Sequence, residues 1–127
     1  MPFFTVVLRK AYGLGAQAMS AGGLHESIFT VAWPTGEFGG MGLEGYVRLG
    51  FRKEMQAIRH PAERQVWFEA KVASLYEAGK ALSIASALEI DAVIDPEQTR
   101  RWIVAGLDAA PPPAPRAGRK RPCVETW

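Results

Sequence analysis

Residues 4–15 read FTVVLRKAYGLG, an apolar run of strand length that leads into a turn with two glycines. The run over residues 3–8 is rich in β-branched and aromatic side chains and is apolar almost throughout. That composition is typical of a strand buried on both faces, as in parallel or mixed sheets that helices cover. Gly13 and Gly15 then predict a tight turn, and a short helix is expected over residues 14–19. A buried strand that turns straight into a helix is the first sign of an α/β fold.

The rest of the chain continues this alternation of strands and helices. Asp95 has the features of a helix N-cap, because Pro96 follows at the first helical position and Gln98 stands three residues after the cap. Pro61 is expected to start another helix for the same positional reason. The further elements that the pattern predicts are a strand over 27–33 ended by Pro34, a short extended segment over 37–41, a helix over 43–58, a helix from Pro61 with an apolar face reaching Leu82, a strand over 88–94, and a helix from Asp95 to Leu107 that turns Trp102 and Ile103 inward.

Charge is divided unevenly along the 127 residues, which carry 15 Lys and Arg against 13 Asp and Glu. Four of the basic residues and one acid lie beyond Ala110, so residues 1–110 hold 11 basic and 12 acidic groups, a net charge of −1. A body with this balance lacks the basic surface of a duplex-binding protein, and no nucleic-acid partner is expected. The pattern predicts a body over residues 1–108 and a Pro-rich basic tail over 109–127.

The amino-acid composition narrows the class of protein further. With 48% hydrophobic and 22% charged residues, the chain has the balance of an ordinary globular domain. No run approaches the roughly 20 apolar residues that span a bilayer, and the amino-terminal residues lack the pattern of an export signal. Cys123 is the single cysteine, so neither an internal disulfide nor a cysteine metal cluster is expected. These features predict a cytoplasmic protein with no membrane partner and no metal.

Two glycine-rich segments are candidates for a site. Residues 12–16, Tyr-Gly-Leu-Gly-Ala, form a strand-to-helix turn in which small residues let a ligand approach the backbone. The start of a helix also leaves several N–H groups without partners, and such donors stabilise a developing negative charge on oxygen. A plain tight turn is the commoner reason for this spacing. Residues 33–45 are also rich in glycine and suit either a functional loop or a segment squeezed between packed layers.

Ionisable side chains form no clear catalytic group. His25 and His60 have neither the spacing of metal ligands nor that of a catalytic triad, so a solvated or structurally hydrogen-bonded role is expected for both. Glu26, Glu37 and Glu44 could act as bases, but no residue nearby in the sequence pairs with them.

Several motifs taken together resemble one family. They are, in chain order, FTVVLRKAYG at 4–13, WPTG at 33–36, GLEG at 42–45, IDAVIDP at 90–96, TRRW at 99–102 and KRPCVETW at 120–127. These motifs are similar to the C-terminal half of the carboxyltransferase (beta) subunits of biotin-dependent acyl-CoA carboxylases of the acetyl- and propionyl-CoA type. The resemblance covers residues 3–107 and the last eight residues.

The resemblance implies a crotonase-like α/β fold, in which ββα units stack into a superhelix, present here as part of the C-terminal domain. It implies a component of an enzyme that moves carboxylate from N1 of carboxybiotin to the α-carbon of an acyl-CoA, with this chain on the biotin-facing side. The implied cofactor is biotin carried by a partner and not bound covalently here. The implied partners are the acyl-CoA substrate, a biotin carboxyl carrier or biotin carboxylase subunit, and further copies of the chain. Because a complete subunit has two halves and forms a hexamer, the chain is expected to be inactive and to associate or aggregate when alone.

The resemblance also assigns roles to the first glycine turn. In the family, backbone N–H groups stabilise the thioester enolate and the biotin ureido oxygen, which puts the biotin-side donors at Leu14 and Gly15. The expected substrate-binding residues are Tyr12, Gly13, Ala16, Trp33, Pro34, Thr35 and Gly36. The chain departs from the propionyl-type subgroup, which has Gly-Gly-Ala where residues 13–15 read Gly-Leu-Gly. Two other functions stay open, a non-catalytic assembly module of the complex and a subunit of a biotin-dependent decarboxylase.

Overall fold

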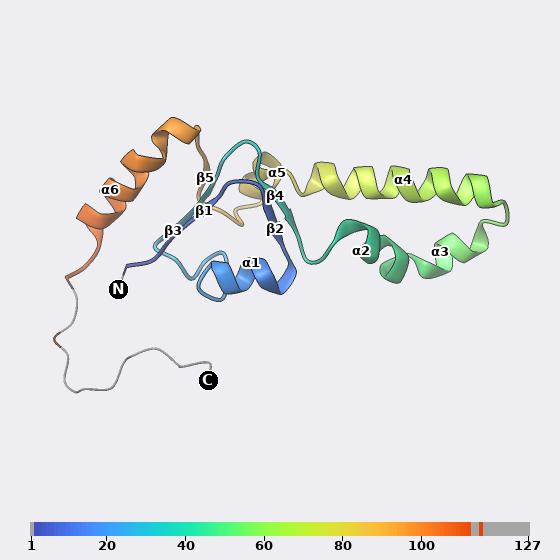
Figure 1. Ribbon diagram of the computed structural model, residues 1–127, viewed down its shortest axis with the longest axis horizontal. Coiled ribbons are helices and arrows are strands. Elements are labelled where there is room, and N and C mark those ends of the chain that lie inside the picture. Colours follow the sequence, from blue (N-terminus) through green and yellow to red (C-terminus); the bar gives the residue numbers. More distant parts are fainter. Residues whose placement is uncertain (1, 113–114, 116–127) are drawn as a thin grey trace.

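Two small parallel sheets lie at the centre of the computed structural model, which describes residues 2–112 and 115 (Figure 1). The first sheet has the strand order β1-β3-β5, with β1 at Phe4–Val7, β3 at Phe29–Ala32 and β5 at Ala92–Val93. The second sheet pairs β2 (Lys10–Tyr12) with β4 (Glu37–Gly39). The strands of both sheets are parallel, so each pair of neighbours is joined by a long connection.

The chain repeats one arrangement. It runs through the first sheet in β1, bends, and runs through the second sheet in β2; β3 and β4 repeat this path alongside. Helix α1 (Gly13–Met19) follows β2, and α2 (Leu43–Gly50) follows β4. Phe4 pairs with Phe29 in the first sheet and Lys10 with Glu37 in the second, so two strand–strand–helix units stack in register. The expected α/β class and its ββα unit are confirmed.

β3 is the centre of the first sheet, and all four of its residues are buried. On one face the Phe29 ring stacks on Phe4, with 4.8 Å between ring centroids, and meets Trp102 edge-on at 5.5 Å. Trp102 belongs to α6 (Thr99–Ala109), which packs on β1 through Gly106, where a Cβ would lie 2.7 Å from the Phe4 ring. The inward positions expected for Trp102 and Ile103 are thereby confirmed. A second buried cluster joins the two sheets to α5 (Ala81–Ser86) and consists of Val7, Ala11, Ala32, Phe38, Ala81 and Ile90.

A helical arm extends away from the sheets (Figure 1). α2 and α3 (Arg52–Ala57) run outward along it, and α4 (Pro61–Ala78) runs back. Val47 of α2 is fully buried where α2 meets α4, and the Phe51 ring meets Trp67 of α4 at 6.1 Å between centroids. Among the helices that the structure describes, none combines the length and the hydropathy needed to cross a bilayer.

The start of α6 follows the sequence prediction. The turn η1 (Pro96–Gln98) leads into the helix, and the Asp95 side chain accepts a hydrogen bond from the Gln98 backbone. In return the Asp95 N–H donates to Gln98 Oε1 at 3.2 Å. The N-cap at Asp95 is therefore confirmed, as is the start of α4 at Pro61.

The helix expected over residues 43–58 is interrupted, so that prediction was wrong. Phe51 separates α2 from α3 with a backbone (φ −111°, ψ 28°) that is not helical. Its ring packs edge-on against both Tyr46, at 6.0 Å, and Trp67. Anchoring this ring between two helices offsets the loss of helical continuity, and periodicity within α2 and α3 does not reveal such a contact.

The apolar face expected to run from Pro61 to Leu82 is also interrupted. α4 ends at Ala78 because Gly79 meets the backbone of β4, where the Phe38 N–H donates to the Gly79 carbonyl at 2.8 Å. Leu82 belongs to the separate helix α5 and its side chain is 71% exposed. The prediction that Leu82 shares a buried face with α4 was wrong.

Strand predictions also needed correction. The strand expected over 88–94 shrinks to β5, because Leu88 has a left-handed backbone (φ 61°) that ends α5 rather than extending a strand. β1 is not buried on both faces: it lies at the sheet edge, and Phe4 and Val6 are only half-buried. β2 was not predicted, since three residues with an exposed Lys10 carry no periodicity to read.

Candidate functional site

The first glycine turn lies where β2 ends and α1 begins. Gly13 adopts the left-handed conformation (φ 60°), and a Cβ there would stand 3.3 Å from the Gly40 carbonyl oxygen. Because β2 and β4 are parallel, the chain leaves both strands at the same end of the second sheet. The structure therefore brings the turn at residues 12–16 against residues 39–42 of the second glycine-rich segment.

Leu14 and Gly15 stand in the first turn of α1, where backbone N–H groups have no intrahelical acceptor. The N-cap residue Tyr12 supplies no side-chain hydrogen bond to this turn. The Leu14 side chain is 82% exposed, and a Cβ on Gly15 would have no atom within 4 Å. The partial positive charge at a helix start adds to these donors. The turn thus combines backbone N–H groups that have no intrahelical acceptor with residues that are exposed.

The loop at residues 33–36 lies at the opposite end of the second sheet, because it enters β4 whereas the turn leaves β2. Two hydrogen bonds fix this loop. Thr35 Oγ1 donates to the carbonyl of Leu8, in the bend between β1 and β2, at 2.6 Å. Trp33 Nε1 donates to Oγ1 of Thr99, at the start of α6, at 3.0 Å. Gly36 is buried, and a Cβ there would lie 3.2 Å from the Ala81 Cβ. The two groups of predicted site residues are therefore separated within this chain.

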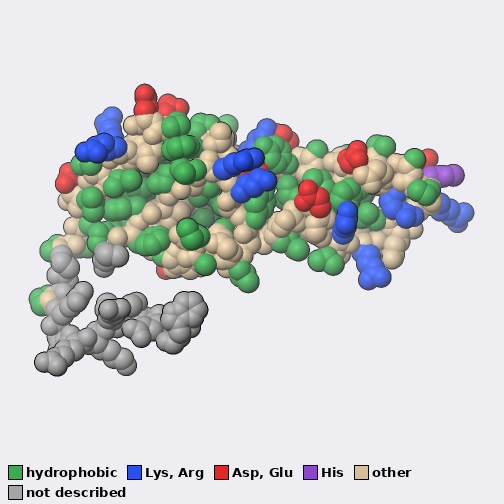
Figure 2. Space-filling view, viewed as in Figure 1, with side chains coloured by type: hydrophobic (Ala, Val, Ile, Leu, Met, Phe, Trp, Pro, Cys, Tyr) green, Lys and Arg blue, Asp and Glu red, His purple; other side chains and the backbone are tan. Residues whose placement is uncertain are grey.

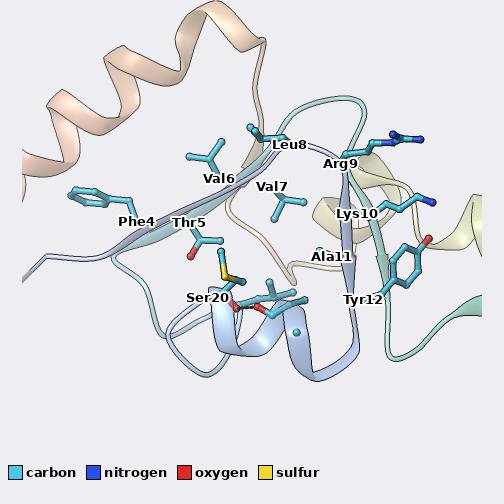
Figure 3. Close-up of a pocket in the computed structure, with 14 residues that line it drawn as sticks. Phe4, Thr5, Val6, Val7, Leu8, Arg9, Lys10, Ala11, Tyr12 and Ser20 are labelled. Atoms are coloured by element: carbon cyan, nitrogen blue, oxygen red, sulfur yellow. Dashed lines mark hydrogen bonds between the residues drawn. The ribbon is translucent and has the colours of Figure 1, made fainter. Parts of the chain in front are cut away.

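Each group lines a different cavity. A cavity of about 760 Å³ lies beneath β1 and beside α1, and Tyr12, Gly15 and Ala16 contribute to it (Figure 3). A second cavity of about 690 Å³ lies at the bend, and Trp33, Pro34 and Thr35 contribute to it. Leu8 and Arg9, in the bend between β1 and β2, line both cavities, so the two cavities are neighbours.

Tyr12 is held by residues that sequence reasoning did not connect with it. Its hydroxyl donates to Glu37 Oε2 at 3.3 Å, and its ring lies where a Cβ on Gly39 would be 2.7 Å away. Burial, followed by the charge of Glu37, raises the pKa of Tyr12 above its usual 10.0. Only the parallel register of β2 with β4 places Glu37 and Gly39 there, and no local pattern in the sequence reveals that register.

The described residues contain no group of three or more His, Cys, Asp or Glu side chains able to hold a metal ion. His25 lies 3.6 Å from Glu89 with 67% of its side chain exposed, which agrees with the solvated role expected for it. The first glycine turn offers backbone N–H donors in the first turn of α1. Such donors stabilise negative charge as it develops on a carbonyl oxygen.

Comparison with known proteins gives a consistent result. The family model described as carboxyl transferase domain matches residues 1–116. The methylmalonyl-CoA carboxyltransferase 12S subunit of Propionibacterium freudenreichii subsp. shermanii is 38% identical over 109 residues, which cover 85% of this chain and 20% of that subunit.

Solved structures similar to this chain come from carboxylases and a transcarboxylase, in agreement with the family model. A single-chain, multi-domain long-chain acyl-CoA carboxylase is 51% identical, with a TM-score of 0.66 over 83% of this chain and 10% of that one. The transcarboxylase 12S hexamer, solved with methylmalonyl-CoA and methylmalonic acid bound, is 33% identical, with a TM-score of 0.73 over 94% of this chain and 23% of that one. The fold is accordingly the crotonase-like one, as part of a domain. The chain spans about 20% of the length of these curated relatives.

Proposed function

Because the chain belongs to the carboxyl transferase domain family, we propose that it supplies the biotin-facing part of a centre that transfers carboxylate between carboxybiotin and the α-carbon of an acyl-CoA. The observation that carries the proposal is the first turn of α1, where the Leu14 and Gly15 N–H groups have no intrahelical acceptor and both residues are exposed. The substrate class follows the names of the relatives, which act on methylmalonyl-CoA or long-chain acyl-CoA.

The geometry of α1 fits a biotin ring carried by a partner. The ring offers a neutral ureido oxygen, which needs hydrogen-bond donors and open space but no charged side chain. The turn supplies both, since no atom lies within 4 Å of a Cβ position on Gly15. When bound, biotin supplies the carboxylate on its N1 atom.

The role of this chain is to stabilise charge at one oxygen. Two backbone N–H groups aimed at the ureido oxygen become stronger partners as that oxygen gains negative charge, which lowers the barrier to carboxylate transfer. Gly13 fixes the direction of these donors, because its left-handed backbone turns the chain sharply from β2 into α1. Tyr12 closes one side, held by Glu37 and Gly39.

The remaining components come from elsewhere. In this proposal the acyl-CoA is bound by the other half of a carboxyl transferase domain, biotin arrives on a carrier domain, and copies of the subunit form an oligomer like the hexamer of the 12S relative. An assembly module without catalysis is the second candidate. It is favoured by the exposed apolar side chains on α1, Leu14 and Met19, which are 82% and 80% exposed.

A chimera separates the two candidates. The chain replaces the segment that it matches in the Propionibacterium 12S subunit, and carboxylate transfer between biotin and propionyl-CoA is measured. Gly15→Pro removes one donor N–H within the first helical turn and is expected to lower the rate about 10²–10³-fold. Gly15→Ala keeps the N–H in open space and is expected to lose far less.

Circular dichroism and the oligomeric state of both variants check that α1 and the assembly survive. An active chimera whose rate is equal in Gly15→Pro and Gly15→Ala would remove the catalytic role and leave the assembly module. A well-folded chimera without transfer activity would contradict the proposed function itself.

A further inference from the structure

A small hollow on the helical arm is lined by three arginines. Arg48 comes from α2, Arg52 from α3 and Arg64 from α4, and the hollow has a volume of about 170 Å³. Met55 and Gln56 complete the set of described residues that line it, and this set contains no carboxylate. Pockets that enclose a whole small-molecule ligand measure roughly 300–1,000 Å³. The hollow therefore has room for one small group of a ligand, in basic surroundings.

The folding of the arm brings these like charges together. Arg48 and Arg52 stand four residues apart, and backbone hydrogen bonds to and from Phe51 span the junction between α2 and α3. Arg64 joins them because α4 runs back along α2 (Figure 1). Like charges one helical turn apart repel each other. A bound anion would offset this repulsion.

Arg64 is held in place by two hydrogen bonds. Its Nε and Nη2 both donate to the Ile58 carbonyl, at 3.2 and 2.7 Å, across the connection between α3 and α4. The residue is half-buried, and its Nη1 donates to no acceptor among the described residues. A guanidinium that is already ordered loses little conformational freedom when it binds an oxyanion. Arg64 is thus a preorganised cation at the edge of the hollow.

Arg48 is restrained by an aromatic ring instead of a hydrogen bond. Its Cζ lies 5.3 Å from the centroid of the Phe68 ring, and Phe68 is the buried residue of α4. This contact orders the side chain but brings no negative charge to it. Arg48 and Arg52 are both exposed, so a ligand from solvent can reach them.

The arginines of the hollow are not neutralised by carboxylates in the described part of the chain. There, the one ion pair that a Lys or Arg side chain forms is Lys80 with Glu77. A hollow on α6 gives the contrast, because its lining combines Arg100 and Arg101 with Glu97 and Asp108. Arginines of a purely structural surface commonly share their surroundings with carboxylates in this way. The three arginines of the arm share theirs with Met55 and Gln56.

We propose that this hollow binds the phosphate group of a small anionic ligand. Guanidinium groups donate paired hydrogen bonds to phosphate oxygens, and a phosphate has enough oxygens to accept from several arginines at once. The group has two possible sources, a free phosphate or diphosphate anion and the phosphates of an acyl-CoA. The second source rests on the proposed function, whereas the first does not. Neither source requires Leu14 or Gly15, which lie outside the arm.

Equilibrium dialysis of the chain against radiolabelled pyrophosphate at low ionic strength tests the site. Saturable binding is expected, and it is expected to weaken as salt is added. Arg64→Gln and Arg52→Gln are each expected to lower the affinity at least about tenfold. Arg52→Gln is the safer variant for the fold, because Arg52 is exposed and donates no hydrogen bond to a described side chain or carbonyl, whereas Arg64 bonds to Ile58.

Matched controls on the same arm separate a defined site from general attraction to positive charge. Arg59→Gln and Lys53→Gln each remove one charge from an exposed position that does not line the hollow. Both are expected to change the affinity for pyrophosphate less than about twofold. Circular dichroism of all four variants checks that the arm keeps its helices. Equal losses of affinity in the control variants and in Arg52→Gln would overturn the proposal.

Competition experiments identify the source of the phosphate. Displacement of pyrophosphate by coenzyme A, but not by pantetheine, which lacks phosphate, assigns the site to an acyl-CoA. If coenzyme A does not displace it, the ligand is a free phosphate anion. The proposal is overturned if the folded chain shows no saturable binding of pyrophosphate. It is equally overturned if malonate binds as tightly, because the hollow then recognises carboxylates in general.

Discussion

At the scale of single residues, Gly79 shows how a backbone contact can override a helical pattern. A Cβ on Gly79 would lie 2.2 Å from the Phe38 carbonyl oxygen, far inside contact distance, and that oxygen belongs to the backbone of β4. Gly79→Ala is therefore expected to lower the free energy of unfolding by about 2–3 kcal/mol. Urea unfolding followed by circular dichroism measures the loss.

The control is Gly50→Ala at the end of α2. Its nearest neighbour is the Tyr46 ring, at an ordinary 3.9 Å. This variant is expected to be neutral or to stabilise the chain by up to about 1 kcal/mol, because alanine favours a helix over glycine. Equal losses in the two variants would show that contact with β4 is not what fixes Gly79.

Tyr12 gives a second prediction at this scale. Burial and the nearby Glu37 raise the pKa of Tyr12, so the folded chain prefers the neutral phenol. The corresponding stability is complete below the usual pKa of 10.0 and is lost as the pH rises through the higher folded value. The free energy of unfolding is therefore expected to fall above pH 10 less steeply in Tyr12→Phe than in the wild type.

Tyr46→Phe serves as the control for losing a phenol, since Tyr46 is 43% exposed on α2. It is expected to keep the alkaline loss of stability seen in the wild type. If Tyr12→Phe loses stability above pH 10 as steeply as Tyr46→Phe does, the phenol of Tyr12 is not the group responsible.

At the scale of elements, α6 depends on its first turn. The reciprocal bonds between Asp95 and Gln98 satisfy backbone groups where the helix begins, and the helix then covers the Phe4 and Phe29 rings. Asp95→Ala is expected to cost about 1 kcal/mol, a fall of about 5 °C in melting temperature. Asp95→Asn keeps an acceptor oxygen at the cap and is expected to retain most of the stability. Equal melting temperatures for Asp95→Ala and the wild type would contradict the role of the cap.

Elements differ in how well the sequence predicts them. The cap at Asp95 and the start of α4 at Pro61 were confirmed, because capping depends on residues adjacent in the chain. The ends of α2 and α4 were not predicted, because contacts with elements distant in the sequence determine them. Phe51 packs against Trp67 of α4, and Gly79 accepts a hydrogen bond from Phe38 of β4. β2 was missed for the same reason: three residues form a strand only because β4 lies beside them.

At the scale of the whole molecule, large apolar residues remain exposed on α1. Leu14 and Met19 are 82% and 80% exposed, and Met19 also lines the cavity beneath β1. Hydrophobic side chains gather over the sheets, whereas charged groups are spread along the arm (Figure 2). Such a surface normally contacts another molecule or another part of a larger protein.

The lone chain is accordingly expected to self-associate as its concentration rises in sedimentation velocity. Met19→Lys is expected to weaken this association, because it puts a charge on the exposed apolar surface of α1. Val66→Lys places the same charge at a 67% exposed position on α4 and is expected to leave association unchanged. A compact monomer at all concentrations, or equal effects of the two variants, would contradict the expectation.

Part of the candidate site could be predicted from the sequence and part could not. The turn at residues 12–16 and the helix that begins there could be predicted, because glycine spacing and helix starts are local properties. The roles of Leu14 and Gly15 remain a proposal that rests on the family. The sequence does not predict that residues 33–36 lie at the opposite end of the second sheet, because this position depends on the direction and register of β2 against β4.

The sequence by itself determined the α/β class, the family and the caps, since motifs and capping depend on neighbours along the chain. Only the tertiary structure decided which strands pair, where α4 ends, and that the enclosed Thr5 hydroxyl has no hydrogen-bond partner among the described residues, whereas Thr30 has one. The physical reason is that hydrogen bonds between strands and contacts with glycine join residues far apart in the sequence. Whether a buried hydroxyl finds a hydrogen-bond partner depends on such distant neighbours.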